Sequence, residues 1–460
     1  MRANENLPIA VVGAGPVGLA AASNLVERGV PFAVFEAGET VGAGVRDWGH
    51  VRIFTTWEQS VDPASRRLLE AAGWSLPQSN ALPTGEDLYR NYLKPLSDLP
   101  GFKGRIHTGT RVTGITRQGI DKVASKGRAE RPFEIHVVAR DGSRRTVTAR
   151  AVIDASGTWH NPNPLGGSGL PAEGEDRVAG RLAYGMPDIL GTQRARYSGK
   201  RVAVVGAGYS AINVLLDLTR LAAETTRGTL AWVVRGKNMA RIYGGGDADE
   251  LAARGKLGQH LKSLVDSGRV RLITGFSTQS VSETPEGLVL TGGTDLGTLK
   301  LEPVDEIIVA TGQRPDLAMT RELRLELDPW LESTKALGPM IDPNIHSCGS
   351  VDPHGYRETG HPEPDFYTIG VKSYGRAPTF LLLTGYEQAR SVAAKLAGDM
   401  EAADNVHLVL PDTGICSTDF EEDGSGCCGG PAPAEANACC VADAVAKDEG
   451  KTGCGCGAAA

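Results

Sequence analysis

Short runs of consecutive apolar residues alternate with glycine-rich turns and helical patterns along the first part of this chain. The runs Ile9–Val12 and Phe32–Phe35 are typical of buried parallel strands. Between them the pattern is helical, because the apolar residues Leu19, Ala22 and Leu25 recur at helical spacing. The order strand, helix, strand predicts a βαβ unit with parallel strands.

The turn between the first strand and the helix carries three glycines with the spacing of a dinucleotide-binding loop. Gly13 makes the tight turn, Gly15 lets a pyrophosphate approach the backbone, and Gly18 lets the helix pack closely on the strand. Glu36 follows the second strand, where its carboxylate can accept hydrogen bonds from a ribose hydroxyl and would repel a 2′-phosphate. The motif predicts an unphosphorylated dinucleotide, either FAD or NAD.

The same order of strand, glycine turn and helix occurs a second time near residue 200. The stretch 201–205, which is apolar from Val202 onward, leads into this turn, and a helical pattern follows it. The second candidate loop is formed by Gly206, Gly208, Ser210 and Ala211. Two dinucleotide units in one chain indicate hydride transfer from a nicotinamide to a group held on the other unit, usually a flavin.

The second unit differs from the first at the end of its second strand. The apolar run 230–234 ends in Arg235, where the first unit has an acid. A guanidinium at this place suits the 2′-phosphate of NADP, so we expect NADPH here. Lys237 and Arg241 follow, either as part of the same positive pocket or as a solvated basic loop.

Composition and charge exclude several classes of protein. The 460 residues include 48 basic and 55 acidic side chains, and the formal charge of −7 argues against nucleic acid as a main partner. No apolar run approaches the roughly 18 residues that a membrane helix needs, so we expect no membrane association. The stretch from residue 2 to residue 22 has some features of a signal peptide, but the first dinucleotide loop explains it.

Cysteine is unevenly distributed along the chain. Cys348 is the only one of the eight cysteines before residue 410, which suits a reducing cytoplasm. The last segment, 411–460, contains the other seven cysteines, nine acidic residues and two basic ones. Because this segment is poor in large apolar residues, we expect a flexible, disordered acidic tail.

Six of the tail cysteines form three close pairs. Paired thiolates can bind a soft metal or metalloid, such as trivalent arsenic, Hg(II), Cu(I) or Zn(II). The candidate ligands are Cys427, Cys428, Cys439, Cys440, Cys454 and Cys456. The alternative is an extension that binds nothing.

With both units in place, the chain resembles the two-dinucleotide-binding flavoproteins and, more closely, the flavin-containing monooxygenases. Three further segments carry the resemblance, which covers about residues 7–400: 152–157 with Gly157, 307–316 with Gly312, and 366–370 with Gly370. It implies an α/β fold with two Rossmann-like domains, FAD and NADPH as cofactors, and the NADPH domain inserted in the FAD domain. The implied segments are 1–165 and 316–410 for FAD, 166–315 for NADPH, and the tail 411–460.

The resemblance implies a flavin pocket but no specific catalytic side chain. Trp48, Arg52 and Tyr374, with Arg46, are candidates to line this pocket. We interpret His50 and His160 as structural, and a helix is expected over residues 384–397. In the stretch 178–184 only Gly180 matches the fingerprint between the family's domains. Tyr184 stands where the family has histidine, which disfavours a Baeyer–Villiger reaction.

The positions of the cysteines and the character of the tail limit which reactions the flavin can carry out. Residues 1–347 contain no cysteine, so reduced flavin has no dithiol there and must pass electrons to oxygen or directly to a substrate. The cysteine-pair tail is similar to those of proteins of arsenical and mercurial resistance. The resemblance therefore implies an FAD- and NADPH-dependent monooxygenase that uses molecular oxygen to oxidise a small soft substrate, arsenite or methylarsenite. Two alternatives remain: a reductase whose tail thiols pass electrons to a disulfide or Hg(II), and a flavin-bound thiol metal buffer without turnover.

Overall fold

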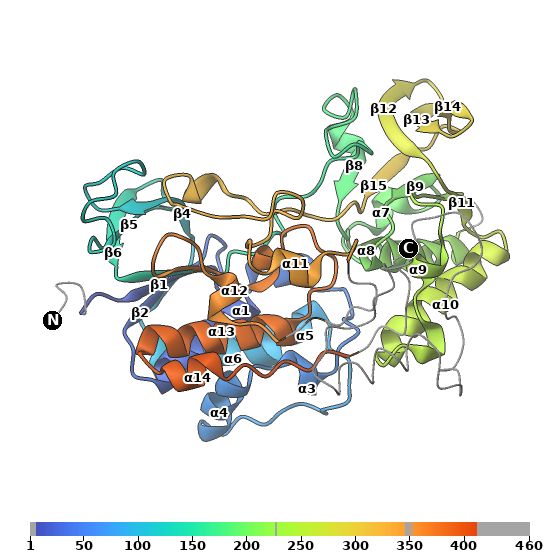
Figure 1. Ribbon diagram of the computed structural model, residues 1–460. Coiled ribbons are helices and arrows are strands. Elements are labelled where there is room, and N and C mark those ends of the chain that lie inside the picture. The colour runs from blue at the N-terminus through green and yellow to red at the C-terminus, as the bar shows by residue number, and fades with distance from the viewer. Residues whose placement is uncertain (1–5, 226–227, 346–350, 352, 412–460) are drawn as a thin grey trace, which may run out of the picture.

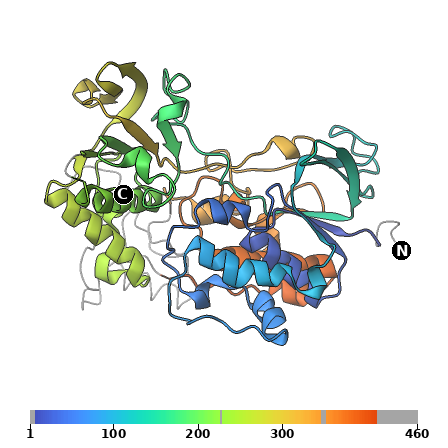
Figure 2. The same ribbon diagram turned by 180° about the vertical axis from the view of Figure 1, so that it is seen from behind.

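The computed structural model describes residues 6–411, except 226–227, 346–350 and 352. Two parallel β-sheets form two lobes that lie side by side, joined by extended segments (Figure 1). Figure 2 shows the same two lobes from behind. Strands of the first sheet precede and follow those of the second in the chain, so the second unit is inserted in the first. The expected α/β fold is thereby confirmed.

The first sheet has the strand order β16-β7-β1-β2-β3, with every neighbouring pair parallel. Its strands are β1 (Ile9–Val12), β2 (Phe32–Phe35), β3 (Ile106–His107), β7 (Ala151–Asp154) and β16 (Phe366–Thr368). Helices α1 (Pro16–Glu27) and α13 (Leu382–Ala397) pack against each other, and their apolar residues share one core with β1. The helix expected over 384–397 therefore begins two residues earlier.

The second sheet has the order β11-β10-β9-β15-β8 and is parallel throughout. Its strands are β8 (Leu182–Tyr184), β9 (Val202–Val205), β10 (Leu230–Val233), β11 (Arg271–Ile273) and β15 (Glu306–Val309). Helices α8 (Tyr209–Ala223) and α10 (Ala252–Asp266) pack on one face, where Trp232 is completely buried. In both units the central strand is fully buried, as the apolar runs predicted.

An antiparallel three-stranded sheet covers the other face of each parallel sheet. The first consists of β4 (Thr110–Arg117), β5 (Phe133–Ala139) and β6 (Arg144–Ala149), and the second of β12 (Ser277–Thr284), β13 (Gly287–Thr294) and β14 (Gly297–Lys300). Ile115 and Ile135 pack with the first parallel sheet, while Leu288 and Leu290 pack with the second. Each parallel sheet is therefore covered on both of its faces.

Shorter helices complete the described part of the chain. The α-helices are α2 (Ala43–Asp47), α3 (Trp57–Ser60), α4 (Pro63–Ala71), α5 (Gly85–Leu88), α6 (Lys94–Ser97), α7 (Arg194–Tyr197), α9 (Ala240–Tyr243), α11 (Gly338–Ile341), α12 (Tyr356–Thr359) and α14 (Met400–Asp404). A π-helical turn forms η1 (Tyr89–Leu93), and 3₁₀ turns form η2 (Pro100–Phe102), η3 (Ala179–Arg181), η4 (Gly246–Ala248), η5 (Ala318–Thr320) and η6 (Gly370–Tyr374). Within the described residues no helix is both long enough and apolar enough to cross a bilayer.

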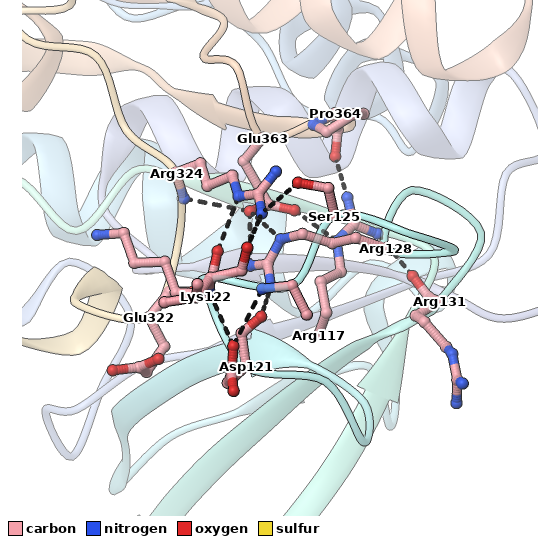
Figure 3. A network of polar contacts seen from close by, with 12 residues as sticks. Arg117, Asp121, Lys122, Ser125, Arg128, Arg131, Glu322, Arg324, Glu363 and Pro364 are labelled. Carbon is pink, nitrogen blue, oxygen red and sulfur yellow. Dashed lines mark hydrogen bonds and ion pairs between the residues drawn. The ribbon is translucent and has the colours of Figure 1, made fainter.

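A buried ionic network holds the amino end of β16 (Figure 3). Glu363 accepts from Arg117 Nε at 2.8 Å and from Arg128 Nη2 at 2.7 Å, and all three side chains are at most 3% exposed. The two guanidinium groups also donate to backbone carbonyls, so the buried charges are well compensated. The network ties the loop between β4 and β5 to the segment just before β16.

Candidate dinucleotide sites

In the first glycine loop, contacts within the protein leave no room for a Cβ at two of the glycines and leave room at the third. A Cβ on Gly13, whose φ is +96°, would lie 2.6 Å from the carbonyl oxygen of Ala155, and a Cβ on Gly18 would lie 2.0 Å from that of Gly13. Gly15 differs, because no atom lies within 4 Å of the place a Cβ would take. Open space beside Gly15 is what a dinucleotide diphosphate needs to approach the backbone.

The start of α1 is well suited to an anion. Gly15 is the N-cap, no side chain caps the helix, and its first turn has no acidic residue. The N–H groups of the first turn and the positive end of the helix dipole therefore remain for a phosphate. This arrangement fits the diphosphate of a dinucleotide, for which the glycine spacing left FAD and NAD as alternatives.

Glu36 has a second role that the sequence did not reveal. Its carboxylate accepts hydrogen bonds from the backbone N–H groups of Ala14 and Gly38, both at 2.7 Å. These bonds hold the glycine loop against the end of β2, while each oxygen keeps a lone pair for a ribose hydroxyl. A cavity of about 330 Å³ adjoins Gly38, between the turn after β2 and strands β4 and β5.

The second glycine loop repeats the geometry of the first. A Cβ on Gly206, whose φ is +138°, would lie 2.1 Å from the carbonyl oxygen of Ala310, whereas nothing lies within 4 Å of a Cβ on Gly208. Gly208 is the N-cap of α8, and Ser210 lies in the first turn. Ala211 takes the place of the third glycine and is completely buried, so this unit accommodates a methyl group there.

Arg235 lies directly beyond the carboxyl end of β10 and is exposed. Its Nη1 donates to the carbonyl oxygen of Gly167 at 2.7 Å, which leaves the other N–H groups of the guanidinium for a ligand. Lys237 forms an ion pair with Asp295, so its charge is partly neutralised. The side chain of Arg241 lies outside the described residues. Recognition of a 2′-phosphate by Arg235 stays a prediction.

The other predicted glycines lie at the same strand edges. Gly157 has a φ of +71° and follows β7, beside Val371. Gly370 has a φ of +74°, lies against Val17 in the first turn of α1, and donates its N–H to Gln388 Oε1 at 2.7 Å. Gly312, in the second unit, has a φ of +87° and lies beside Asn163. The structure thus brings Gly157 and Gly370 to the first glycine loop, at the edge where α/β sheets bind ligands.

Of the four candidate flavin-pocket residues, Trp48 and Arg52 both adjoin residues 84–85, and Tyr374 belongs to η6. Trp48 follows α2, and a Cβ on Gly85 would lie 2.7 Å from its ring, while exposed Arg52 donates to the Leu82 carbonyl at 2.5 Å. Tyr374 is 0% exposed, and its hydroxyl lies 3.5 Å from His354 Nε2. Burial raises the pKa of Tyr374, so this phenol stays protonated.

One contact between the units was not anticipated. The ring of Phe54, from the first unit, lies 5.2 Å from that of Tyr209, the residue directly after Gly208. Within the first unit, Trp159 Nε1 donates to Asp47 Oδ2 at 3.1 Å, and His160 Nε2 lies 3.8 Å from the same oxygen. The first unit therefore touches the start of the second glycine loop. No local sequence signal marks such contacts, because they depend on how the two units meet.

A larger cavity, of about 870 Å³, lies away from these loops. It is lined by residues at the amino ends of β9 and β10, including Arg201 and Leu230, and by the C-terminal end of α8. Since dinucleotides bind at the carboxyl ends of the strands, this cavity takes no part in the candidate sites. Residues 412–460, which include the six candidate cysteine ligands, lie outside the described residues. Within the described residues no group of three or more His, Cys, Asp or Glu side chains could hold a metal ion.

Fold and glycine loops together define a flavoprotein with two dinucleotide-binding units. The chain belongs to the pyridine nucleotide-disulphide oxidoreductase family, which it matches over residues 10–336. FAD and NADPH are the cofactors that this family implies, and the open space beside Gly15 and Gly208 fits a dinucleotide at each loop.

Comparisons with individual proteins agree with this assignment. Flavin-containing monooxygenase 1 of Mus musculus is 24% identical over 349 residues, which is 66% of this chain and 61% of the relative. The relationship to flavin-containing monooxygenases expected from the sequence is confirmed. The chain nevertheless spans less than two thirds of that relative's length.

Two solved structures show the same fold at low sequence identity. The bacillithiol disulfide reductase Bdr (YpdA) of Bacillus cereus has a TM-score of 0.63 and 18% identity, covering 85% of this chain and 99% of that one. DfoA of Erwinia amylovora, a cadaverine monooxygenase bound to FAD, has a TM-score of 0.59 and 12% identity, covering 86% and 95%. One fold therefore serves both reductases and monooxygenases, and it does not decide between these reactions.

Proposed function

We propose that the protein is an FAD- and NADPH-dependent monooxygenase that oxidises a soft substrate, trivalent inorganic or methylated arsenic, to the pentavalent form. The observation that carries the reaction class is the pair of glycine loops, each open at its central glycine, in a chain without a cysteine before residue 348. Electrons that arrive on a flavin in this body have no dithiol in residues 1–347 to reduce. Similarity to a mammalian flavin-containing monooxygenase supports the same choice.

The chain's own residues would bind and orient the two cofactors. The N-terminus of α1 and Glu36 would hold the diphosphate and a ribose of FAD, and Gly157 and Gly370 would let the chain pass closely beside it. The N-terminus of α8 and Arg235 would hold NADPH. FAD, when bound, supplies two-electron redox chemistry and reaction with oxygen. Overall, NADPH, a proton, O₂ and trivalent arsenic would give NADP⁺, water and a pentavalent product that has gained one oxygen atom from O₂.

The choice of arsenic rests on the tail. Its cysteine pairs, Cys427 with Cys428 and Cys439 with Cys440, can each present two thiolates to one trivalent arsenic. Oxidation to the pentavalent state would remove the affinity of arsenic for thiols and release the product. A tail that captures the substrate would raise its local concentration near the flavin.

The proposal includes an assignment of domains and of cellular location. Segments 1–165 and 316–410 would form the FAD domain, 166–315 the NADPH domain, and 411–460 a substrate-capturing tail. A body with a single cysteine suits a reducing compartment, so we place the protein in the cytoplasm, without a nucleic acid partner.

The substrate is tested by following NADPH oxidation with arsenite and with methylarsenite, and by identifying the arsenic product chromatographically. We expect one pentavalent product per NADPH consumed. Serine at the four cysteines of the two vicinal pairs, or removal of residues 411–460, should lower turnover at low substrate and leave the rate at saturating substrate nearly unchanged. NADPH consumption that arsenic does not affect, with arsenic recovered unchanged, would refute arsenic as the substrate. Loss of turnover at every substrate level, with flavin reduction intact, would favour the reductase with redox-active tail thiols.

A further inference from the structure

A buried ion pair lies at the carboxyl edge of the first sheet, behind the first glycine loop. Lys372 Nζ lies 2.7 Å from Asp154 Oδ2, and the two side chains are 2% and 1% exposed. Asp154 is the last residue of β7, and Lys372 belongs to η6, just after β16. Burying both charges is costly.

Both members of the pair hold one exposed residue, Ser156. Asp154 Oδ1 accepts from the backbone N–H of Ser156 at 3.1 Å and from its hydroxyl at 2.7 Å. Lys372 Nζ donates to the same hydroxyl at 3.0 Å. A Cβ on Gly13 would lie 3.0 Å from the Cα of Ser156, so this serine lies directly against the glycine loop. The ion pair therefore determines the position of a loop residue that borders the candidate diphosphate site.

The sign of the charge behind this loop matters for a ligand that carries two negative charges. His361 also acts electrostatically on Asp154, but burial lowers the pKa of His361 to about 4, so it is neutral near pH 7. Lys372 thus supplies the positive charge that offsets Asp154. Without it, a buried carboxylate would stand behind the loop and repel a diphosphate through a medium that screens poorly.

We infer that Lys372 is a positioning residue for FAD: it neutralises Asp154 and holds Ser156 so that the first loop can accept the diphosphate. This inference rests on the proposed binding of FAD at the first loop. Lys372 acts through Asp154 and Ser156, and its effect on FAD is largely one of charge. If the pair were purely structural, loss of Asp154 and loss of Lys372 would lower FAD affinity equally.

The test measures FAD binding by the full-length protein after the flavin has been removed, using the quenching of flavin fluorescence, with thermal unfolding of the flavin-free protein in parallel. K372M leaves Asp154 unpaired, and we expect FAD to bind about ten- to a hundredfold more weakly. D154N leaves the lysine charge in place, and FAD should bind at least as tightly as to wild type. The double variant D154N/K372M is neutral and should bind FAD nearly as tightly as wild type.

Arg128→Met is the matched control. Arg128 is also a buried cation of the first unit, and it pairs with the carboxylate of Glu363 just before the amino end of β16 (Figure 3). R128M should lower the unfolding temperature and leave FAD affinity unchanged. If K372M does not fold, D154N is compared with D154N/K372M, and the single variant should bind FAD more tightly.

Two results would overturn the inference. One is equal FAD affinity in wild type, K372M and the double variant. The other is an equal loss of affinity in D154N and K372M, which would make the pair structural only. Failure of the wild-type protein itself to bind FAD would instead contradict the proposed function and leave the variants without a reference, so wild type is measured first.

Discussion

Substitution of Gly15 distinguishes an effect on FAD binding from an effect on folding. Its φ and ψ of −74° and −176° are extended values that any residue adopts, and no protein atom would touch a Cβ there. Replacing glycine at such a position should raise the unfolding free energy of the flavin-free protein by about 0.4–1 kcal/mol, because the unfolded chain loses freedom. Gly15→Ala and Gly15→Val should therefore fold.

The same substitution should interfere with FAD. A methyl group at Gly15 occupies the space through which a diphosphate approaches the helix N-terminus. Overpacking of this kind costs about 1–3 kcal/mol, so G15A should bind FAD roughly 5- to 150-fold more weakly. The larger side chain of G15V should prevent binding, and the protein should purify without the yellow colour of flavin.

Two matched variants complete the comparison. Gly18→Ala places a Cβ 2.0 Å from the Gly13 carbonyl, so the backbone must move and the flavin-free protein should be destabilised. Gly180→Val is the control, because Gly180 is exposed and also has no atom within 4 Å of a Cβ, but it lies in η3, outside the glycine loops. G180V should keep both its stability and its flavin.

The assay combines the ratio of flavin to protein absorbance after purification with thermal unfolding of the flavin-free proteins. The expected pattern is a stable, colourless G15V, an unstable G18A and an unchanged G180V. A G15V protein with full FAD content would mean that the diphosphate does not pass beside Gly15, and the first site would be wrong. An unfolded G15V would contradict the open space on which the reasoning depends.

Three further predictions concern the second site and the response to pH. Gly208→Val should abolish NADPH binding in titrations while FAD content stays normal. Loss of FAD instead would mean that the two loops have been assigned to the wrong cofactors. Arg235→Ala should weaken the binding of NADPH by about 1.5 kcal/mol and leave the binding of NADH unchanged. The value is at the lower end for a charge-assisted hydrogen bond because the side chain is exposed. Equal losses of affinity for NADPH and NADH would exclude contact with a 2′-phosphate. Burial raises the pKa of Asp62 to about 6, so its stabilising contribution is present below pH 4 and lost as pH rises through 6. In wild type the free energy of unfolding should fall by up to about 3 kcal/mol between pH 4 and 7 because of Asp62, and in Asp62→Asn it should fall less. Thermal unfolding at several pH values measures this difference. Parallel plots of unfolding free energy against pH for the two proteins would contradict the raised pKa.

The features predicted most reliably from the sequence are those determined by neighbours in the chain. The run Ile9–Val12 and the loop from Gly13 to Gly18 have the predicted structure, because strand, turn and helix are determined by local pattern and by the conformations that glycine allows. Element ends were less certain, since α13 begins at Leu382 and not at the expected residue 384. Leu382 precedes the region of clear helical periodicity, and its helical conformation depends on packing of α13 against α1.

The features that could not be predicted depend on segments far apart in the chain. Nothing local in the sequence indicates that Lys372 pairs with Asp154. The contact of Phe54 with Tyr209 likewise arises only when the two units meet. Glu36 was assigned to a ribose, yet its carboxylate also binds two backbone N–H groups of its own chain. Such pairings need the folded backbone, because side-chain chemistry alone allows many partners.

The central claim is that reduced flavin in this protein passes its electrons to oxygen. It is tested most directly by measuring NADPH oxidation by the purified, FAD-loaded protein with and without oxygen, in the presence of arsenite, of a low-molecular-weight disulfide or of Hg(II). A monooxygenase should oxidise NADPH with arsenite only when oxygen is present, and should form one pentavalent arsenic for each NADPH. Sustained NADPH oxidation under argon with the disulfide or with Hg(II) as acceptor would contradict the monooxygenase and identify a reductase.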